Sequence, residues 1–401
     1  MKPPPRPLRV TMVNKYYSPP HLGGVEAVVR TLSEGLVELA DARVRALVSN
    51  EGRARLAETI GGVDVVRLPR QLAVSSAPVA AGLPGALRDE MRRKGPNGAE
   101  PPDVIHLHSP YPWGELAFLQ ARPDVPSVVL YHSDIVRQKR LLTAYRPFLE
   151  RFLERVDLIV SSSPNLVRSS ELLAPRAETC RVVPFGLPAA RLAATPAVLR
   201  RAAELRAAHA GRRVVLFVGR LVYYKGADVL VRAMAQVDAD LVLIGRGPLE
   251  SELRELAAAS GSAARVTFLA PQNDDELAAW YHAADVFCLP SVARSEAFGL
   301  VQIEAHAAGT PVVSTDLPTG VPFANLHGVT GLIVPPGEAA ALAAALNRLL
   351  GDDELRARLG AQAQARALRE FTVPRMVAGT LGVYAEAIAR HAARKGCLVR
   401  G

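Results

Sequence analysis

The sequence contains little cysteine and no long apolar run. Its 401 residues include three cysteines, Cys180, Cys288 and Cys397, an odd number with no close pair. This spacing argues against a disulfide framework and against a cysteine zinc site. No run of about 18 apolar residues exists, so we expect no segment that spans a membrane. Sparse cysteine also favours a reducing compartment, and we expect a cytoplasmic protein. The opening Met1-Lys-Pro-Pro-Pro-Arg lacks the apolar core of a signal peptide.

Several ligand-binding motifs are also missing. No Gly-x-Gly-x-x-Gly fingerprint follows the first predicted strand, which argues against a dinucleotide cofactor. Asp238-Ala-Asp precedes its predicted strand, so no Asp-x-Asp metal motif stands at a strand's carboxyl end. His106, His108 and His132 lack a convincing set of partner ligands, and we expect no metal site. The chain shows no helix-turn-helix, RNA-binding or zinc-finger signature, so a nucleic-acid partner is not expected.

The composition is that of a soluble globular protein. Apolar residues make up 49% and charged residues 22% of the chain, and its length suggests two domains. The formal net charge is +9, with a surplus of six positive charges over residues 1–190 and of three over residues 191–401. A basic first half suits an anionic partner, such as a phosphorylated ligand, an anionic membrane surface or nucleic acid. A soluble, Arg-rich composition is the plainer explanation of the same charge.

Both halves of the chain show short apolar runs that alternate with helical segments. Strands that are apolar on both faces and alternate with helices are typical of parallel sheets covered on both sides. Two such sets predict an α/β protein with two Rossmann-like domains. The predicted strands are Leu8–Val13, Arg43–Ser49, Asp64–Leu68, Val104–His108, Ser127–His132, Leu158–Ser161, Arg213–Val218, Ala239–Ile244, Arg265–Leu269, Val286–Leu289 and Pro311–Ser314. The predicted helices are Gly24–Ala40, Ala227–Gln236, Leu249–Ser260, Asp275–Ala283, Ala339–Arg369 and Val377–Arg394.

A stretch rich in Gly, Pro and Ala, Gly186–Pro196, marks the predicted domain boundary. We expect a first Rossmann-like domain over residues 1–190 and a second over residues 191–375. A C-terminal helix over residues 376–401 is expected to cross back to the first domain. Residues 72–101 are poor in strand signal, and we expect them to form a mobile surface segment.

The most informative segment carries two glutamates after a predicted strand. Glu296 follows the apolar run Val286–Pro290, at the end of the strand where open α/β sheets bind ligands. Phe298-Gly-Leu then opens a helix, whose free N–H groups and positive end form an anion site. Glu304 lies within the first two turns of this helix and can point to the same crevice. The carboxylates suit sugar or ribose hydroxyls, and the amides suit a diphosphate. The alternative is a capping glutamate beside an exposed helix glutamate.

A second segment places two cations at a strand tip. Gly219 and Arg220 follow the strand that ends at Val218, and Lys225 stands just before the next helix, with Gly226 allowing a tight turn. Two cations that face one crevice can neutralise a leaving diphosphate without a metal. A pair of solvated surface cations is the alternative.

The first half supplies further candidates. Gly23 and Gly24, at a predicted helix start, permit a close approach of the backbone to a phosphate or a sugar. His132 stands at the carboxyl end of another predicted strand and would face the same interdomain crevice. A lone histidine at a strand end is, however, more often structural.

Taken in order, these segments resemble the retaining, sugar-nucleotide-dependent glycosyltransferases of family 4. The resemblance rests on Gly-Gly-Val-Glu at residues 23–26, Gly-Arg and Lys-Gly within residues 219–226, the pair Glu296 and Glu304, and Leu332-Ile-Val-Pro-Pro-Gly. It covers nearly the whole chain, and the glutamate pair with its flanks is its most specific part. The resemblance implies the GT-B fold, in which two Rossmann-like domains face a central cleft. The first domain would bind the acceptor and the second the nucleotide-sugar.

The resemblance also implies roles for single residues. Arg220 and Lys225 would bind the donor diphosphate and stabilise the leaving nucleotide. Glu296 would position the transferred sugar, and His132 would lie beside that sugar, which completes the implied catalytic set. Glu304 would hold the ribose hydroxyls. The implied donor-binding residues are Gly23, Gly24, Gly219, Phe298, Gly299, Leu300 and Glu304. Because the family is metal-independent, we expect no metal and no cofactor besides the nucleotide-sugar, which is a substrate.

Two further segments are similar to bacterial surface-polysaccharide members of the family. Tyr131-His-Ser-Asp-Ile-Val-Arg-Gln-Lys and Leu317-Pro-Thr-Gly-Val-Pro-Phe-Ala-Asn resemble enzymes that use GDP-mannose or a related GDP-sugar. The acceptor would be a glycan or a polyprenyl-linked sugar in polysaccharide or lipopolysaccharide biosynthesis. A UDP-sugar-dependent transferase and a non-catalytic sugar-nucleotide-binding partner subunit stay open as alternatives. Front-face and double-displacement routes to retention also stay open.

The stretch Arg137–Arg155 combines cations with apolar residues at helical spacing. Such a helix suits an anionic membrane interface, so we expect peripheral binding at the inner face of the cell membrane. The alternative is an apolar stripe that packs on the sheet and leaves the cations in water. Pro147 interrupts the helix in either case.

Overall fold

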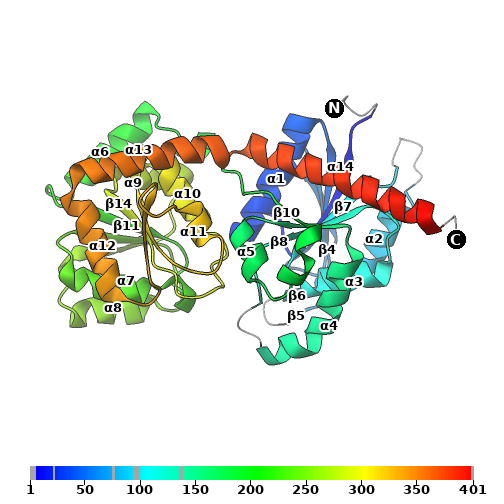
Figure 1. Ribbon diagram of the computed structural model, residues 1–401, viewed down its shortest axis with the longest axis horizontal. Helices are drawn as coiled ribbons and strands as arrows, with labels where there is room; N and C mark the ends of the chain where they lie inside the picture. Colours follow the sequence, from blue (N-terminus) through cyan, green and yellow to red (C-terminus); the bar gives the residue numbers. More distant parts are fainter. Residues whose placement is uncertain (1–5, 21–22, 75–76, 94–99, 136–138, 399–401) are drawn as a thin grey trace. The chain divides into compact units, whose positions relative to one another are not determined.

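The chain forms two compact units. Figure 1 shows the structure, a computed structural model. It describes residues 6–20, 23–74, 77–93, 100–135 and 139–398. The first unit contains residues 1–162, 170–186 and 373–401, and the second contains residues 163–169 and 187–372. The chain therefore leaves the first unit a few residues before the predicted boundary at 190. It returns to the first unit a few residues before the predicted boundary at 375.

An eight-stranded sheet in the order β10-β9-β8-β7-β1-β2-β4-β3 forms the centre of the first unit. Neighbouring strands pair in parallel except for β3, which runs antiparallel to β4. The strands are β1 (Arg9–Val13), β2 (Arg43–Ser49), β3 (Leu56–Ile60), β4 (Val63–Leu68), β7 (Val104–Ser109), β8 (Ser127–Tyr131), β9 (Leu158–Ser161) and β10 (Cys180–Val182). All residues of β7, β8 and β9 are buried, as expected for strands covered by helices on both faces.

The C-terminal helix belongs to the packing of the first unit. The helices of this unit are α1 (Gly24–Ala40), α2 (Leu83–Met91), α3 (Pro112–Ala121), α4 (Lys139–Arg155) and α14 (Val373–Leu398). Helix α14, red in Figure 1, packs against α1, drawn in blue, and against β8 and β9. The contact is close at Gly35, where a Cβ atom would lie 2.8 Å from Cγ1 of Val373. A glycine at this position therefore lets the two helices pack closely.

The second unit has a six-stranded parallel sheet in the order β13-β12-β11-β14-β15-β16. Its strands are β11 (Val214–Val218), β12 (Asp240–Ile244), β13 (Val266–Leu269), β14 (Val286–Leu289), β15 (Val312–Thr315) and β16 (Gly331–Val334). Strands β12 and β13 lie on one side of β11, and β14, β15 and β16 lie on its other side, so the strand order reverses between β11 and β14. A reversal of strand order opens a crevice at the carboxyl ends of the strands, and α/β proteins bind ligands there.

Helices surround this sheet and supply its core. They are α5 (Pro164–Ser169), α6 (Pro196–Ala207), α7 (Ala227–Ala233), α8 (Glu250–Ala259), α9 (Asp274–Ala283), α10 (Leu300–Ala307), α11 (Val321–Ala324), α12 (Ala339–Gly351) and α13 (Asp353–Glu370). Phe217 and Leu241 of the sheet share one buried cluster with Leu230 of α7 and Leu346 of α12. Because helices bury both faces of the sheet, its strands end where this packing ends. The loops that carry the site begin at these strand ends.

The α/β fold class is confirmed, and each predicted strand agrees with an observed strand to within one residue at either end. Residues 72–101, which the sequence suggested were poor in strands, contain regular structure in their described part, and their expected mobility stays a prediction. That part contains α2 and a two-stranded sheet of β5 (Leu72–Val74) and β6 (Ala77–Val79), while residues 75–76 and 94–99 lie outside the described residues. The helical stretch Ala339–Arg369 forms two helices. The side chain of Asp352 accepts a hydrogen bond from the N–H of Leu355 at 2.8 Å and caps α13.

Candidate active site

The predicted site residues of the second unit lie at the reversal of strand order between β11 and β14. Gly219 and Arg220 follow β11 directly, and Glu296 lies in the loop between β14 and α10. The loops after these two strands approach each other closely at Gly226. This residue has a left-handed backbone, with φ of 65°, and a Cβ atom there would collide with the carbonyl oxygen of Pro290. Glycine is therefore the residue that fits here without a shift of the backbone.

Lys225 and Glu296 form the ion pair at the centre of this site. Nζ of Lys225 lies 2.6 Å from Oε2 of Glu296, and the two side chains are 12% and 9% exposed. The hydroxyl of Ser291 donates a hydrogen bond to the same carboxylate oxygen at 3.0 Å. The structure thus brings together the cation predicted for a diphosphate and the carboxylate predicted for a sugar. A cation and a carboxylate thus lie side by side at the ends of these strands.

Arg220 and Lys225 both contact one aromatic residue, Tyr224. Nη2 of Arg220 lies 3.3 Å from the hydroxyl oxygen of Tyr224, and Nζ of Lys225 lies 5.7 Å from the centre of the Tyr224 ring. Arg220 is exposed. A solvated guanidinium beside a nearly buried ammonium can bind an anion that enters from solvent. Tyr224 was not predicted as part of the site.

The start of helix α10 supplies an anion-binding element next to Glu296. The helix begins at Leu300, directly after Gly299, whose backbone is left-handed with φ of 74° and ψ of 66°. A Cβ atom on Gly299 would lie 2.5 Å from Cδ2 of Leu289. Within the described part of the chain no side chain caps this helix, so its first turn offers backbone N–H groups to a ligand. Phe298 is buried, and its carbonyl accepts a hydrogen bond from Nε2 of Gln302 at 2.9 Å.

Glu304 is held from one side by a buried tyrosine. The hydroxyl of Tyr281 donates to Oε2 of Glu304 at 2.6 Å, and Nη1 of Arg191 lies 3.4 Å from Oε1. Arg191 also pairs with Asp274 at 2.9 Å. Burial, together with the charge of Glu304, raises the pKa of Tyr281 well above its usual range, so this hydroxyl stays a donor. Tyr281 thus holds Oε2 of Glu304, while Oε1 has only the longer contact with Arg191.

Tyr281 and Arg191 are partners of Glu304 that the sequence did not predict. Tyr281 lies in the apolar helical stretch Asp275–Ala283, where nothing distinguishes it from an ordinary core residue. Arg191 lies in the predicted boundary stretch, which gave no reason to expect a contact with a helix more than a hundred residues away.

Two protein families match consecutive parts of the chain. Residues 22–191 match Glycosyltransferase Family 4, and residues 204–366 match Glycosyl transferases group 1. The O-antigen chain mannosyltransferase C of Escherichia coli is 34% identical, over 94% of this chain and 98% of that protein. The chain belongs to the group 1, family 4 glycosyltransferases.

Further relatives and solved structures agree with this membership. The D-rhamnosyltransferase WbpZ of Pseudomonas aeruginosa is 38% identical, over 67% of this glycosyltransferase and 70% of that protein. The sucrose-phosphate synthase of Thermosynechococcus elongatus superposes with a TM-score of 0.77 at 25% identity, covering 95% of this chain and 99% of that chain. HepE of Anabaena, in complex with UDP-glucose, superposes with a TM-score of 0.74 at 22% identity, covering 94% of this chain and 99% of that chain. This similarity supports the fold and not the substrate. The predicted GT-B fold is confirmed.

The first unit of the glycosyltransferase contains the other predicted site residues. Gly23 has an extended backbone and precedes Gly24, the first residue of α1. A Cβ atom on Gly23 would collide with Oε2 of Glu26, so the carboxylate of Glu26 covers this helix start. An anion that binds there has to displace Glu26. His132 is buried directly after β8, and burial lowers its pKa to about 3, so the ring is neutral at physiological pH.

Three histidines of the first unit, His106, His108 and His132, stack on one another. Among the described residues, no group of three or more His, Cys, Asp or Glu side chains can hold a metal ion. The rings of His106 and His108 have centroids 4.8 Å apart, and those of His108 and His132 have centroids 5.3 Å apart. All three rings are buried.

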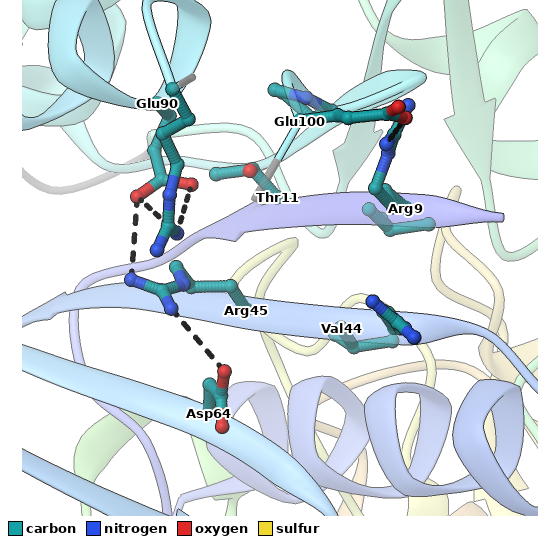
Figure 2. A pocket seen from close by; sticks show the side chains of 11 residues that line it. Arg9, Thr11, Val44, Arg45, Asp64, Glu90 and Glu100 are labelled. Carbon is teal, nitrogen blue, oxygen red and sulfur yellow. Dashed lines mark hydrogen bonds and ion pairs between the residues drawn. The ribbon is translucent and has the colours of Figure 1, made fainter. Parts of the chain in front are cut away.

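A pocket of about 210 Å³ lies at the amino ends of β1, β2 and β4 in the first unit, the edge of the sheet away from the carboxyl ends of its strands. Figure 2 shows Arg45 between the carboxylates of Asp64 and Glu90, at 3.3 and 3.5 Å, and Arg9 beside Glu100. The acids and the arginines largely compensate one another's charge. Because α/β sheets bind substrates at the carboxyl ends of their strands, we assign this pocket no part in sugar transfer.

Helix α4 contains the stretch predicted to lie on a membrane. Arg137 lies outside the described residues, and the side chains of residues 139–142 are not described either. In the described part, Phe152 is buried and its ring meets that of Phe118 edge to face, with centroids 5.5 Å apart. Phe148 is 50% exposed. The described apolar stripe thus packs within the unit, apart from Phe148. Across the described helices, none is both long and apolar enough to cross a membrane.

Proposed function

We propose that this glycosyltransferase moves a hexose from a nucleotide-sugar onto a glycan or polyprenyl-linked acceptor in cell-surface polysaccharide biosynthesis. The pair of Lys225 and Glu296 carries the proposal, because it joins a cation for a diphosphate to a carboxylate for a sugar at the ligand-binding edge of the sheet. The similarity to an O-antigen chain mannosyltransferase supports polysaccharide as the class of product.

The proposed chemistry follows from the charges that develop when the donor breaks. Cleavage of a glycosyl–phosphate bond builds positive charge on the sugar and negative charge on the diphosphate. Arg220, Lys225 and the first turn of α10 stabilise the anion, and a well-placed donor contributes about 3–4 kcal/mol. Two cations and a helix start neutralise this charge without a metal, so we propose a metal-independent reaction. Glu296 positions the sugar, and Glu304 holds the ribose hydroxyls.

The proposal keeps the remaining roles that the family resemblance implies. Gly23, Gly24 and His132 contribute donor contacts from the first unit, with His132 beside the transferred sugar. Gly219 and the backbone of Phe298, Gly299 and Leu300 contribute contacts from the second. The sugar is transferred with retention of its anomeric configuration.

For the donor we propose GDP-mannose or a related GDP-sugar. Two relatives named above are a mannosyltransferase and a D-rhamnosyltransferase, which favours a sugar of this kind. A UDP-sugar is the second candidate, because HepE of Anabaena, with the same fold, was solved with UDP-glucose.

We further propose that the enzyme works in the cytoplasm as a peripheral protein at the inner face of the cell membrane. A polyprenyl-linked acceptor resides there, and α4 presents the exposed residues Phe148, Arg151 and Arg155 on the surface of the first unit. An exposed aromatic residue beside cations suits an anionic interface.

A donor panel tests the proposal. The purified protein is incubated with GDP-mannose, GDP-rhamnose and UDP-glucose, with and without a polyprenyl-linked oligosaccharide, and the released nucleoside diphosphate and glycosylated product are quantified with and without EDTA. We expect GDP to be released from a GDP-sugar only when the acceptor is present, and we expect EDTA to leave the rate of this release unchanged. Transfer from UDP-glucose alone would select the second candidate. Absence of transfer from every donor would favour the non-catalytic partner subunit.

A further inference from the structure

Three buried imidazoles form a row in the first unit. His106 and His108 lie two residues apart on β7 and therefore share one face of the sheet, with their ring planes 4° apart. His132 follows the neighbouring strand β8 and stacks on His108. Its backbone N–H donates to the carbonyl of Ser109 at 2.8 Å, which anchors it beside the end of β7.

One hydrogen bond joins His132 to this row. Nδ1 of His108 lies 3.0 Å from Nε2 of His132. Burial lowers the pKa of His108 well below its usual range and that of His132 to about 3, so both rings are neutral at physiological pH. A neutral imidazole carries one N–H donor and one acceptor nitrogen. One ring therefore donates across this contact and the other accepts, and only two arrangements are possible.

The other nitrogen of His108 decides between them. Nε2 of His108 is buried and has no hydrogen-bond partner in the described part of the chain. If the hydrogen were on this nitrogen, a buried N–H donor would be left unpaired, which proteins avoid more strictly than an unpaired acceptor. The hydrogen of His108 therefore lies on Nδ1 and is donated to Nε2 of His132. His132 must then carry its own hydrogen on Nδ1, which, unlike Nε2 of His108, is not among the buried side-chain atoms that lack a hydrogen-bond partner in the described residues.

We propose that His108 is a positioning residue that holds His132 in the Nδ1–H tautomer, so that His132 presents a hydrogen-bond donor on the side of its ring away from His108. This inference rests on the proposed function in taking His132 to contact the transferred sugar. A donor at that position suits an acceptor oxygen of the donor substrate, such as a sugar hydroxyl oxygen or a phosphate oxygen. Without His108, Nε2 of His132 loses its partner and the ring is free to take the other tautomer.

The same strand offers a matched control. His106 is as buried as His108 and stacks on it, but its Nδ1 lies 2.7 Å from the hydroxyl oxygen of Tyr384 in α14. His106 therefore supports the row without a hydrogen bond to His132. The variant His106→Phe keeps an aromatic ring against His108 and removes only the contact with Tyr384.

Two variants of His108 separate its hydrogen bond from its packing. The amide nitrogen of Asn occupies nearly the position of Nδ1 in His, whereas that of Gln lies nearer the position of Nε2. We expect His108→Asn to retain the donor to His132 and most of the turnover. We expect His108→Gln and His108→Leu to lower kcat about tenfold or more with a smaller change in the KM for the donor. His106→Phe should lower the melting temperature and leave kcat within about twofold of the wild-type value.

Nitrogen-15 NMR of the histidine side chains gives a readout that does not depend on activity. In the wild-type protein His132 should show a protonated Nδ1 and an unprotonated Nε2, and His108→Leu should change this signature. An Nε2–H tautomer of His132 in the wild type would overturn the proposal. So would equal kcat losses in His106→Phe and His108→Leu, or equal losses in His108→Asn and His108→Gln. Absence of sugar transfer by the wild type would contradict the proposed function instead, and the NMR spectrum would still test the tautomer.

Discussion

Lys225 and Glu296 form a nearly buried ion pair, and in our proposal this pair serves both the diphosphate and the sugar of a nucleotide-sugar. A nearly buried ion pair is poorly screened, and removal of one partner leaves an uncompensated charge. Ser291 holds the carboxylate by a further hydrogen bond. If a diphosphate binds Lys225 as proposed, Glu296 keeps its hydrogen bond from Ser291 and stays in place.

Glu304 and Tyr281 allow nucleotide binding to be separated from catalysis. Tyr281→Phe removes the hydroxyl that orients Glu304, so we expect nucleoside diphosphate affinity to fall about three- to tenfold. Glu304→Gln should weaken the same binding. Glu296→Gln should instead lower turnover more than nucleotide affinity, because we propose that its carboxylate positions the sugar. Isothermal titration calorimetry with GDP alone, beside steady-state kinetics, measures the difference.

The matched control for Tyr281→Phe is Tyr111→Phe, which removes a buried hydroxyl bonded to Ser49 in the first unit. We expect this variant to leave nucleotide affinity unchanged. Equal losses of nucleotide affinity in Glu296→Gln and Glu304→Gln would contradict the separate roles of the two glutamates.

The buried titratable groups of the first unit predict how its stability depends on pH. Burial lowers the pKa of His106 and His132 to about 3, so between pH 3 and 6.5 the unfolded chain binds protons that the folded chain does not, and stability is lost as pH falls. Burial raises the pKa of Glu115 to about 7, so between pH 4.5 and 7 the folded chain binds a proton that the unfolded chain does not. This group therefore adds stability as pH falls through that range. Each group contributes on the order of 1 kcal/mol per pH unit inside its window.

Because the histidines outnumber this glutamate, we expect the melting temperature to fall between pH 7 and pH 5. Thermal unfolding followed by circular dichroism across this range measures the fall, and His106→Phe should reduce it. A melting temperature that stays constant or rises toward pH 5 would show that the histidines are not held neutral by burial.

At the scale of elements, glycines set the approach of the loops after β11 and β14. Gly226→Ala would force a side chain into a left-handed backbone and against the carbonyl oxygen of Pro290. We expect a loss of about 2 kcal/mol or more, together with weaker donor binding. Gly337 has a similar backbone, with φ of 83°, but open space where its Cβ atom would be. Gly337→Ala should therefore show only the smaller cost of backbone strain, and equal losses in the two variants would contradict the close approach of the loops.

The same elements show what the sequence could and could not predict. Strands buried on both faces carry runs of apolar residues, so β9, β14 and their neighbours were predictable nearly to the residue. Strand β3 is almost wholly exposed and has no such run, and it pairs with β4 through a hairpin at the sheet edge. The position of Glu296 after a strand end was predictable, but its pairing with Lys225 depends on which strands are neighbours, and strand order is a property of the folded sheet.

At the scale of the whole molecule, the surplus of positive charge in residues 1–190 matters for the proposed membrane surface. We expect the protein to co-sediment with anionic vesicles at low salt and to be released as salt rises, because each cation near the surface adds roughly 1 kcal/mol of screened attraction. Replacement of Phe148, Arg151 and Arg155 of α4 by Ser, Glu and Glu should abolish binding. Binding that survives these changes would place the membrane surface elsewhere, and neutral vesicles provide the reference.

The central claim is that the crevice between the ends of β11 and β14 cleaves a nucleotide-sugar, with Lys225 stabilising the leaving diphosphate. Acceptor-dependent release of nucleoside diphosphate by Lys225→Ala, compared with the wild type and with Arg232→Ala, tests it most directly. Arg232 is an exposed cation of the same unit that pairs with Asp228 at 2.7 Å and has no proposed role. We expect Lys225→Ala to lose about a hundredfold or more in turnover, while Arg232→Ala stays within about twofold. Near-wild-type turnover in a folded Lys225→Ala variant would contradict the claim.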